Sequence, residues 1–549
     1  MSDLALIVHP SSNFIYLKEE FDKDNTIAQS LLEFCDLIKS PEQIYTFEIT
    51  PYSLWTGAAK GVTFNDIQHI FETHAENDIP KWYYEQIKKG INTFGTLSFQ
   101  LEKDKLRLVA NHIDLINELV TFDEIAIKII GRPNDSCLEF HPRHRTELKK
   151  ILFRHDYFIC DYVEENGEDF SIQMNPKDSN GNLLTLYDYQ NDAVQSFLTN
   201  MQHAGGKGTI IMPPASGKTL VGIKLMEHLS KSTLIIVENR DSIVRWINEL
   251  FDKTDLTNSN LSIFESDNSE IKPVTIATYQ SISNYIHLFH SFGVVIYDDC
   301  HKLPTDENIK TSDIQAQYKI AMSSTLARSD KNGDLVFALV GPKWYEVLHR
   351  TLVRKGFQVE VTCVEIKVSL HPSIYRQYNL SSVKKQRKVA GENPEKLNVI
   401  KKLLNSLPFN RVLLISYYQD ITPKLSNRLN INAIHQGVSE DDKNKLVEEF
   451  NTNQINILAA NSLLTEKTLF KNVEALIGVS FQMGSEREEY LRIGKIISKD
   501  GYKSQGHLYS LVTKHSIEET DYRKRRKSLI NYGFRYKIYD PTMSLGGAK

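Results

Sequence analysis

The sequence predicts an α/β protein with two tandem parallel-sheet domains, preceded by a mixed α+β N-terminal region. Between residues 181 and 345, short apolar runs of strand length alternate with helical segments, and a second series of the same kind lies between 346 and 540. Strands that alternate with helices favour a buried parallel sheet, because each crossover helix covers one face of that sheet. The residues before 181 also mix apolar runs with helical patterns.

Length and composition limit the classes of protein that this chain can be. It has 549 residues, of which 65 are basic and 69 acidic, so its formal net charge is −4. At about 150 residues per domain, this length predicts three or four domains. With 41% hydrophobic and 24% charged residues the chain is globular, which excludes disordered, collagen-like and low-complexity classes. The charge balance excludes a broadly basic coat for nucleic acid, but it leaves room for a local basic cleft.

The cysteines and the apolar runs predict where the protein works. None of the five cysteines belongs to a Cys-x-x-Cys pair, so we expect neither a zinc ribbon nor an iron–sulfur cluster. Scattered cysteines in odd number indicate reduced thiols in a cytoplasmic or nuclear setting. The start of the chain does not resemble a signal peptide, and no apolar run is long enough to span a membrane. We therefore expect a soluble, cytoplasmic protein, associated with the nucleoid if it is bacterial or archaeal and located in the nucleus if it is eukaryotic. We also expect a monomer.

The order of apolar runs and turn residues predicts the domain division. Helical patterns at 26–38 and 64–73 belong to the N-terminal region, and the polar stretch 174–182 is the best boundary signal in the chain. We expect a linker near 345–365. The expected strands lie at 208–212, 234–237, 274–277, 294–297, 411–416, 455–459 and 475–479. The expected segments are an N-terminal region (1–115), a recognition-like region with linker (116–180), a nucleotide-binding domain (181–345) and a second α/β domain (346–540).

A strand, a loop of small residues and a helix follow one another around Lys218. The loop reads Pro213-Pro214-Ala215-Ser216-Gly217-Lys218-Thr219. These are the parts of a phosphate-binding loop, in which backbone N–H groups and the helix N-terminus attract the phosphates of ATP. In such a loop, Ala215, Ser216 and Gly217 supply backbone N–H groups, Lys218 reaches the β- and γ-phosphates, and the Thr219 hydroxyl binds Mg²⁺. Met212 stands where the usual pattern has a further glycine. A chance Gly-Lys-Thr at a helix start is the alternative, but the strand-to-helix setting favours ATP binding.

Two carboxylates follow the apolar strand at 294–297. Asp298 and Asp299 come directly after this strand, where nucleotide-binding folds of this type hold Mg²⁺. A solvated Asp-Asp turn is the alternative interpretation. Phosphate loop and carboxylate together predict a nucleotide-binding core with ATP and Mg²⁺ as cofactors.

From about residue 4 to residue 540, the order of motifs resembles the XPB family of superfamily-two DNA helicases in its shorter bacterial and archaeal form. Residues 186–190 are similar to the family's LRDYQ motif, the loop before Lys218 to PCGAGKT, and 275–280 to TISTYQ. Asp298-Asp299-Cys300-His301 stands where the family has DEVH. In the second half, 489–495 resembles motif VI (QRLGR), and 508–537 resembles the C-terminal end of the family. No single motif of the second half is specific to the family, but the order and spacing of these motifs are.

The resemblance implies two tandem RecA-like P-loop motor domains and a role for each matching residue. Gln190 would contact adenine, and His301 with Ser323 and Thr325 would couple the nucleotide state to the DNA-binding motifs. Arg492 and Lys495 would act in catalysis from motif VI. The expected nucleic-acid contacts are Arg240, Arg245, Thr278 and Gln280. The basic run at 522–527 carries five charges in six residues, and we interpret it as a solvated helix face.

The sequence departs from the family at chemically important positions. Asp299 replaces the glutamate that orients the attacking water, and a misplacement of about 1 Å can cost roughly 100-fold in rate. Lys495 and Ser498 stand where motif VI has arginine fingers, which are worth about 10³–10⁵-fold. The motif V region at 464–473 lacks the usual Ser-Ile-Asp, and Arg328-Ser329-Asp330 replaces Arg-Glu-Asp.

Two functions from different classes remain open at this point. The first is an ATP-dependent DNA helicase or translocase that acts on duplex DNA in nucleotide excision repair or transcription-linked DNA opening, with slow ATP turnover. The second is a helicase-like, DNA-binding scaffold that binds ATP without hydrolysing it and serves a repair partner such as a nuclease. A metabolic P-loop enzyme is disfavoured because it would leave the second α/β domain unexplained. Both functions have DNA and a repair or transcription protein as partners.

Overall fold

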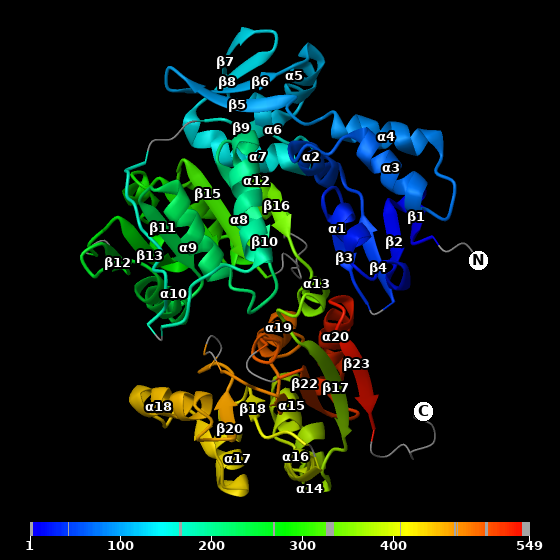
Figure 1. Cartoon of the computed structure of the whole chain (residues 1–549), viewed down its shortest axis with the longest axis vertical. Coiled ribbons are helices and arrows are strands. Elements are labelled where there is room, and N and C mark those ends of the chain that lie inside the picture. Colours follow the sequence, from blue (N-terminus) through cyan, green and yellow to red (C-terminus); the bar gives the residue numbers. More distant parts are fainter. Residues whose placement is uncertain are drawn as a thin grey trace. The chain divides into compact units, whose positions relative to one another are not determined.

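The computed structural model of the chain contains two compact units (Figure 1). It describes residues 4–41, 43–163, 167–179, 181–266, 269–324, 334–406, 408–465, 468, 470–499 and 503–540. Unit 1 comprises Met1–Leu37, Thr46–Pro213 and Gly217–Leu348, and unit 2 comprises Ile38–Tyr45, Pro214–Ser216 and His349–Lys549.

The N-terminal region contains two small sheets with helices between their strands. The first sheet has the order β1-β2-β4-β3, and the second has the order β7-β8-β6-β5-β9 and is antiparallel except for the β5–β9 pair. The elements are β1 (Leu6–His9), β2 (Phe14–Lys18), α1 (Thr26–Leu32), β3 (Asp36–Lys39), β4 (Ile44–Glu48), α2 (Pro51–Ala59), α3 (Phe64–His74), α4 (Lys81–Ile91), β5 (Leu97–Glu102), β6 (Lys105–Ala110), α5 (Ile113–Leu119), α6 (Asp123–Ala126), β7 (Ile129–Asn134), β8 (Cys137–Phe140), α7 (Arg145–Arg154) and β9 (Cys160–Asp161). The predicted mixed α+β character is confirmed.

Unit 1 also contains a seven-stranded parallel sheet with the order β12-β13-β11-β14-β15-β10-β16. Every residue of β10, β11 and β14 is buried, as expected for strands covered on both faces. The elements are α8 (Asp188–Asn200), β10 (Lys207–Ile211), α9 (Lys218–Leu229), β11 (Thr233–Val237), α10 (Arg240–Lys253), β12 (Leu261–Phe264), β13 (Val274–Thr278), α11 (Tyr279–Ile282), β14 (Val294–Asp298), β15 (Tyr318–Ser323), α12 (Leu335–Leu339) and β16 (Lys343–Glu346).

Unit 2 contains a second seven-stranded parallel sheet, with the order β19-β20-β18-β21-β22-β17-β23. Alternate residues of β18 belong to two different apolar clusters, so both faces of this sheet are buried. The elements are α13 (His349–Arg354), β17 (Glu360–Val368), α14 (Pro372–Asn379), α15 (Val383–Gly391), α16 (Glu395–Ser406), β18 (Val412–Ser416), α17 (Ile421–Leu429), β19 (Asn432–Ile434), α18 (Glu440–Asn451), β20 (Ile457–Asn461), β21 (Ala475–Gly478), α19 (Glu486–Gly494), β22 (Gln505–Thr513), α20 (Ile517–Asn531) and β23 (Arg535–Tyr539).

Three expectations about local structure need correction. The helix expected at 26–38 ends at Leu32, because the chain turns there and Asp36–Lys39 pairs as strand β3. The linker expected at 345–365 instead carries α13 and the first part of β17. The boundary expected at 115 falls inside the five-stranded sheet, since β6 before it pairs with β8 after it. The seven expected strands are all present, each shifted by at most about two residues, a typical uncertainty for strand ends.

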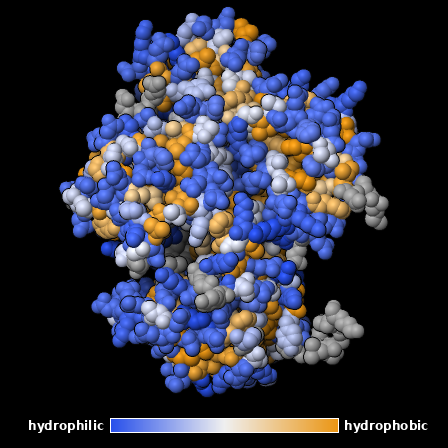
Figure 2. All heavy atoms as spheres, in the orientation of Figure 1, coloured by the Kyte–Doolittle hydropathy of each residue, from blue (hydrophilic) through white to orange (hydrophobic). Residues whose placement is uncertain are grey.

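The face of the molecule drawn in Figure 2 is mostly polar. Figure 2 shows hydrophilic residues over most of the face in view, with hydrophobic residues in smaller patches between them. In the described part of the chain, no helix has both the length and the apolar character needed to cross a membrane. All five cysteines are buried as unpaired thiols.

Candidate nucleotide-binding site

The phosphate loop connects the end of β10 to the start of α9. Gly217 is the N-cap of α9 with a φ of 80°, a left-handed conformation that glycine adopts without strain. A Cβ atom at this position would lie 2.3 Å from Nε2 of Gln190, so the close approach also requires glycine. The Lys218 Nζ group donates hydrogen bonds to the carbonyl oxygens of Met212 and Pro213, both at 3.1 Å, and to Oγ of Ser324 at 2.8 Å. The lysine is therefore held across the loop, at the N-terminal end of a helix.

Gln190 lies beside this loop. It is in the first turn of α8, where its Oε1 accepts a hydrogen bond from the Tyr187 backbone N–H at 2.9 Å. Its side chain is buried, with 4% of its surface exposed. The contact with Gly217 brings it to the phosphate loop, and its role toward adenine stays a prediction.

Asp298 is the last residue of β14, and its carboxylate is bonded by three donors. The Arg245 Nη2 and Trp246 Nε1 atoms donate to Oδ2 at 2.7 and 2.9 Å, and the backbone N–H of Asp299 donates to Oδ1 at 3.0 Å. Asp299 itself has a φ of 54°, in the left-handed region that Asn and Asp tolerate best among non-glycine residues. Because β14, β15 and β10 are adjacent parallel strands, Asp298, Ser323 and the phosphate loop lie at the same edge of the sheet.

The structure brings two of the expected coupling residues together. Nδ1 of His301 lies 3.0 Å from Oγ of Ser323, which is the last residue of β15. The contact links the segment after β14 to the end of β15. Thr325 and the Arg328-Ser329-Asp330 element lie outside the described residues.

The donors at this edge suit Mg²⁺. Thr219 lies in the first turn of α9 and offers a hydroxyl, and Asp298 offers a buried carboxylate. Magnesium prefers such oxygen donors and is commonly held by one or two protein groups together with nucleotide phosphates. Among the described residues there is no group of three or more His, Cys, Asp or Glu side chains that could hold a metal ion by themselves. This arrangement fits an ion that arrives with the nucleotide.

The residues that are expected to contact nucleic acid differ in their exposure to solvent and in their bonding partners. Arg240 begins α10 with 82% of its side chain exposed, and it lies 3.7 Å from Glu265. Thr278 caps α11 by accepting a hydrogen bond from the Ser281 backbone, and Gln280 is exposed. Arg245 is paired with Asp298, so a contact between Arg245 and a nucleic-acid strand would require this ion pair to break.

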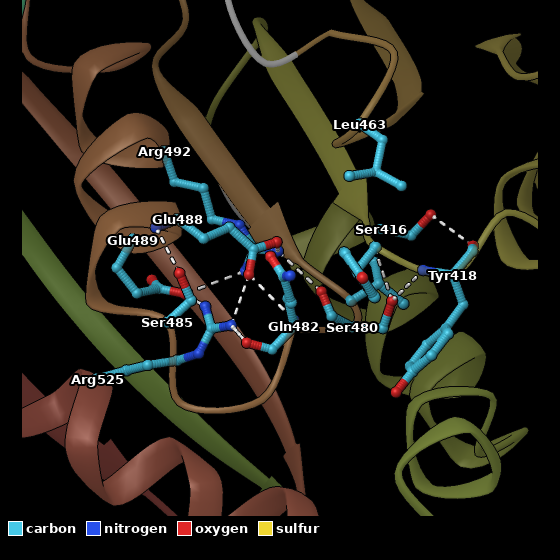
Figure 3. A network of polar contacts seen from close by, with 12 residues as sticks. Ser416, Tyr418, Leu463, Ser480, Gln482, Ser485, Glu488, Glu489, Arg492 and Arg525 are labelled. Carbon is cyan, nitrogen blue, oxygen red and sulfur yellow. Dashed lines mark hydrogen bonds and ion pairs between the residues drawn. The ribbon is translucent and has the colours of Figure 1, made fainter. Parts of the chain in front are cut away.

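In unit 2, Arg492 belongs to a buried network (Figure 3). Its guanidinium donates to Glu488 at 2.9 Å, to Glu489 at 3.2 Å and to the Ser480 carbonyl at 2.8 Å, and 2% of the residue is exposed. Arg525 of α20 donates to the same two carboxylates and to the carbonyl oxygens of Gln482 and Met483. Both guanidinium groups lie over the ring of Phe481. Arg492 is thus engaged with two carboxylates of its own helix, α19, which Arg525 in turn connects to α20. The expected catalytic role of Arg492 stays a prediction.

The charges of this network stabilise one another. Burial alone would raise the pKa of Glu488, but Arg492 and Arg525 hold that pKa below its ordinary value. Sequence reasoning missed Arg525, because the run 522–527 was interpreted as a solvated face. That interpretation is wrong for Arg525, which is fully buried, and for Arg526, which pairs with Glu365. Glu488 and Glu489 precede Arg492 by four and three residues, a spacing that indicates ion pairs within α19 but does not point to Arg525.

Lys495 is held by the segment that corresponds to motif V. Its Nζ donates to the carbonyl oxygens of Thr465 at 2.7 Å and Thr468 at 3.1 Å, and it lies 5.2 Å from the centroid of the Phe470 ring. Lys467 and Leu469 of that segment lie outside the described residues. Lys495 also lines a pocket at the carboxyl ends of β18 and β20, together with Tyr417 and Ser462.

Three family models and several curated relatives match this chain. The family model described as ERCC3/RAD25/XPB C-terminal helicase matches residues 352–546, the model of the Type III restriction enzyme res subunit matches 183–328, and a helicase conserved C-terminal domain model matches 7–129. The DNA 3′-5′ helicase XPB of Mycobacterium tuberculosis (strain ATCC 25618 / H37Rv) is 27% identical over 563 residues, which cover 100% of both chains. The protein of the same name from Kineococcus radiotolerans is 27% identical over 565 residues, covering 100% of this chain and 98% of that one.

A solved structure supports the fold. The ATP-dependent Type ISP restriction-modification enzyme LlaBIII bound to DNA matches with a TM-score of 0.50 and 12% identity, over 79% of this chain and 39% of that chain. The two parallel sheets and the phosphate loop therefore define a protein with two RecA-like domains. Within that class, the chain belongs to the XPB/Rad25 family of helicases.

Proposed function

We propose that this chain is an ATP-dependent DNA helicase or translocase that acts on duplex DNA, in nucleotide excision repair or transcription-linked DNA opening. The observation that carries the proposal is the shared sheet edge of the Lys218 loop, Asp298 and the His301–Ser323 contact, in a chain that matches bacterial XPB proteins over its whole length. The relatives are named DNA 3′-5′ helicases, so we extend this polarity to the chain as part of the proposal.

Each residue of the site has a proposed task. Lys218 would exchange its carbonyl partners for the β- and γ-phosphates, while the backbone N–H groups of Ala215, Ser216 and Gly217 surround them. Thr219 and Asp298 would hold Mg²⁺, which neutralises phosphate charge. Asp299 would orient the attacking water, Gln190 would contact adenine, and His301 would pass a change at the nucleotide to Ser323 and the segment that follows it. Arg240, Thr278 and Gln280 would contact the phosphates of a strand.

Slow turnover is part of the proposal. Asp299 is one methylene shorter than the glutamate of the family, and Lys495 has no planar fork with which to bind a phosphate in two places. Ser498 provides no charge at all. The same three residues support the second candidate, in which the chain binds ATP and DNA but serves mainly as a scaffold for a repair partner such as a nuclease.

Substitution of Lys218 tests whether the loop drives ATP hydrolysis. We expect Lys218→Ala to lower the DNA-stimulated rate by at least about 100-fold, because a preorganised charge at the transferring phosphate is lost. The rates are measured with duplex, forked, bubble and single-stranded DNA. Equal rates for the two proteins would contradict the motor function. Salt-dependent DNA binding without hydrolysis would then support the scaffold.

A further inference from the structure

The Asp298 carboxylate already has a cation beside it. Arg245 Nη2 lies 2.7 Å from Oδ2, which also accepts the Trp246 indole N–H at 2.9 Å. Two donors occupy Oδ2, while Oδ1 has one donor, the Asp299 N–H at 3.0 Å. We propose that Arg245 is an internal counter-cation of Asp298 that competes with the divalent metal ion, and so sets the metal concentration at which the nucleotide site fills. This inference rests on the proposed ATP site.

Of the three donors, only Arg245 is able to leave. The Asp299 donor is part of the backbone, and Trp246 is fully buried between α10 and α9. A Cβ atom on Gly222 of α9 would lie 2.8 Å from the Trp246 ring, which shows how closely the two helices pack. The Arg245 side chain, by contrast, is 35% exposed. A rotation about its own side-chain bonds would carry the guanidinium into solvent without moving α10.

One hydrogen-bond donor of the Arg245 guanidinium group has no acceptor among the described residues. This donor is the Nε atom, which is buried. A buried donor without an acceptor weakens the state that contains it, so the release of Arg245 recovers part of the cost of breaking the pair. Asp241 is exposed and lies four residues earlier on α10, a spacing at which an acidic and a basic side chain attract each other on a helix surface. The released guanidinium therefore has a second carboxylate within reach.

Arg245 and the metal ion would compete for Asp298 because both are positively charged. A guanidinium and a divalent cation on one buried carboxylate repel each other, so metal binding favours the conformation in which Arg245 has withdrawn. When only a fraction of molecules is in the competent conformation, the apparent affinity falls by that fraction. Arg245 would thus lower the affinity of the site for metal without touching the nucleotide.

The test measures binding of Mn²⁺ to the full chain by electron paramagnetic resonance, in the presence of the non-hydrolysable analogue AMP-PNP. The variants are Arg245→Gln and Arg245→Met, which remove the charge while keeping a long helix-forming side chain. The matched control is Lys253→Gln, which removes one charge from the same helix about 12 Å away along its axis. Asp298→Asn identifies the binding that depends on this carboxylate, and circular dichroism checks that each variant is folded.

We expect both Arg245 variants to bind Mn²⁺ roughly tenfold more tightly than the natural chain, since an opposite charge at this distance typically shifts a protonation equilibrium by a similar factor. Lys253→Gln should leave the affinity unchanged. Equal or weaker Mn²⁺ binding by the Arg245 variants, with binding still sensitive to Asp298→Asn, would overturn the competition and leave the proposed ATP site intact. If Asp298→Asn changes nothing, the proposed ATP site itself fails, and the inference fails with it.

Discussion

Replacing Arg525 with alanine is expected to destabilise the chain by about 3–5 kcal/mol, because it removes one of the two cations that balance the buried carboxylates of Glu488 and Glu489 and leaves Arg492 to balance both. Arg525 is fully buried and donates to Glu488 and Glu489 as well as to two carbonyl oxygens. In a folding unit of about 200 residues, each 1 kcal/mol of lost stability lowers the midpoint temperature of unfolding by roughly 2–4 °C. The midpoint should therefore fall by about 6–20 °C. Calorimetry or thermal circular dichroism of the full chain measures this shift.

The same helix provides the control for this prediction. Arg523 lies two residues before Arg525 on α20 and is exposed, so Arg523→Ala should change the transition by no more than about 2 °C. Arg525→Lys keeps the charge but cannot donate to two carboxylates and two carbonyls at once, and we expect an intermediate loss. Adding Glu489→Gln to Arg525→Ala should recover part of the stability, since Arg492 then balances one buried carboxylate of this pair instead of two. Equal transitions for Arg525→Ala and Arg523→Ala would show that the network does not stabilise the fold.

Residues at the carboxyl ends of predicted strands were the ones that sequence reasoning placed well. The Lys218 loop and Asp298 lie at the carboxyl ends of two parallel strands, β10 and β14, that the sequence predicts, so the position of each strand also places its candidate site residue. Ser323 lies at the end of β15, a strand that was not predicted, and only the resemblance to the family indicated this residue.

Contacts between distant segments could not be predicted in this way. Arg245 and Asp298 are 53 residues apart, and nothing in the local pattern of α10 indicates a partner on β14. Strand β17 was missed for a related reason: Glu365 and Lys367 interrupt its apolar run, although both are buried. Glu365 is compensated by Lys367, Arg526 and the Tyr536 hydroxyl, and the last two are more than 150 residues away in the sequence. A buried charge in a strand becomes intelligible only when its partners are known.

The Asp299→Glu variant is expected to raise the maximal rate of ATP hydrolysis, by up to about 100-fold if the carboxylate is at present about 1 Å too far from the attacking water. Asp299 follows Asp298 at the end of β14, and its backbone has a φ of 54° and a ψ of 46°. The left-handed region disfavours glutamate more than aspartate, so the gain in rate should come with a small loss of thermal stability. Stability and turnover would then change in opposite directions, which a general improvement of folding could not produce.

Two further variants decide whether the extra methylene acts on the chemical step. Asp299→Asn keeps the size and the backbone preference of aspartate but removes the charge, so we expect it to abolish the remaining hydrolysis while ATP still binds. The double variant Lys218→Ala/Asp299→Glu should be inactive, since the added reach of the carboxylate has no effect without a bound phosphate. Single-turnover measurements with bound DNA separate hydrolysis from product release. If Asp299→Glu leaves the single-turnover rate unchanged, the short side chain does not limit hydrolysis, and slow turnover would have to be traced to Lys495 and Ser498.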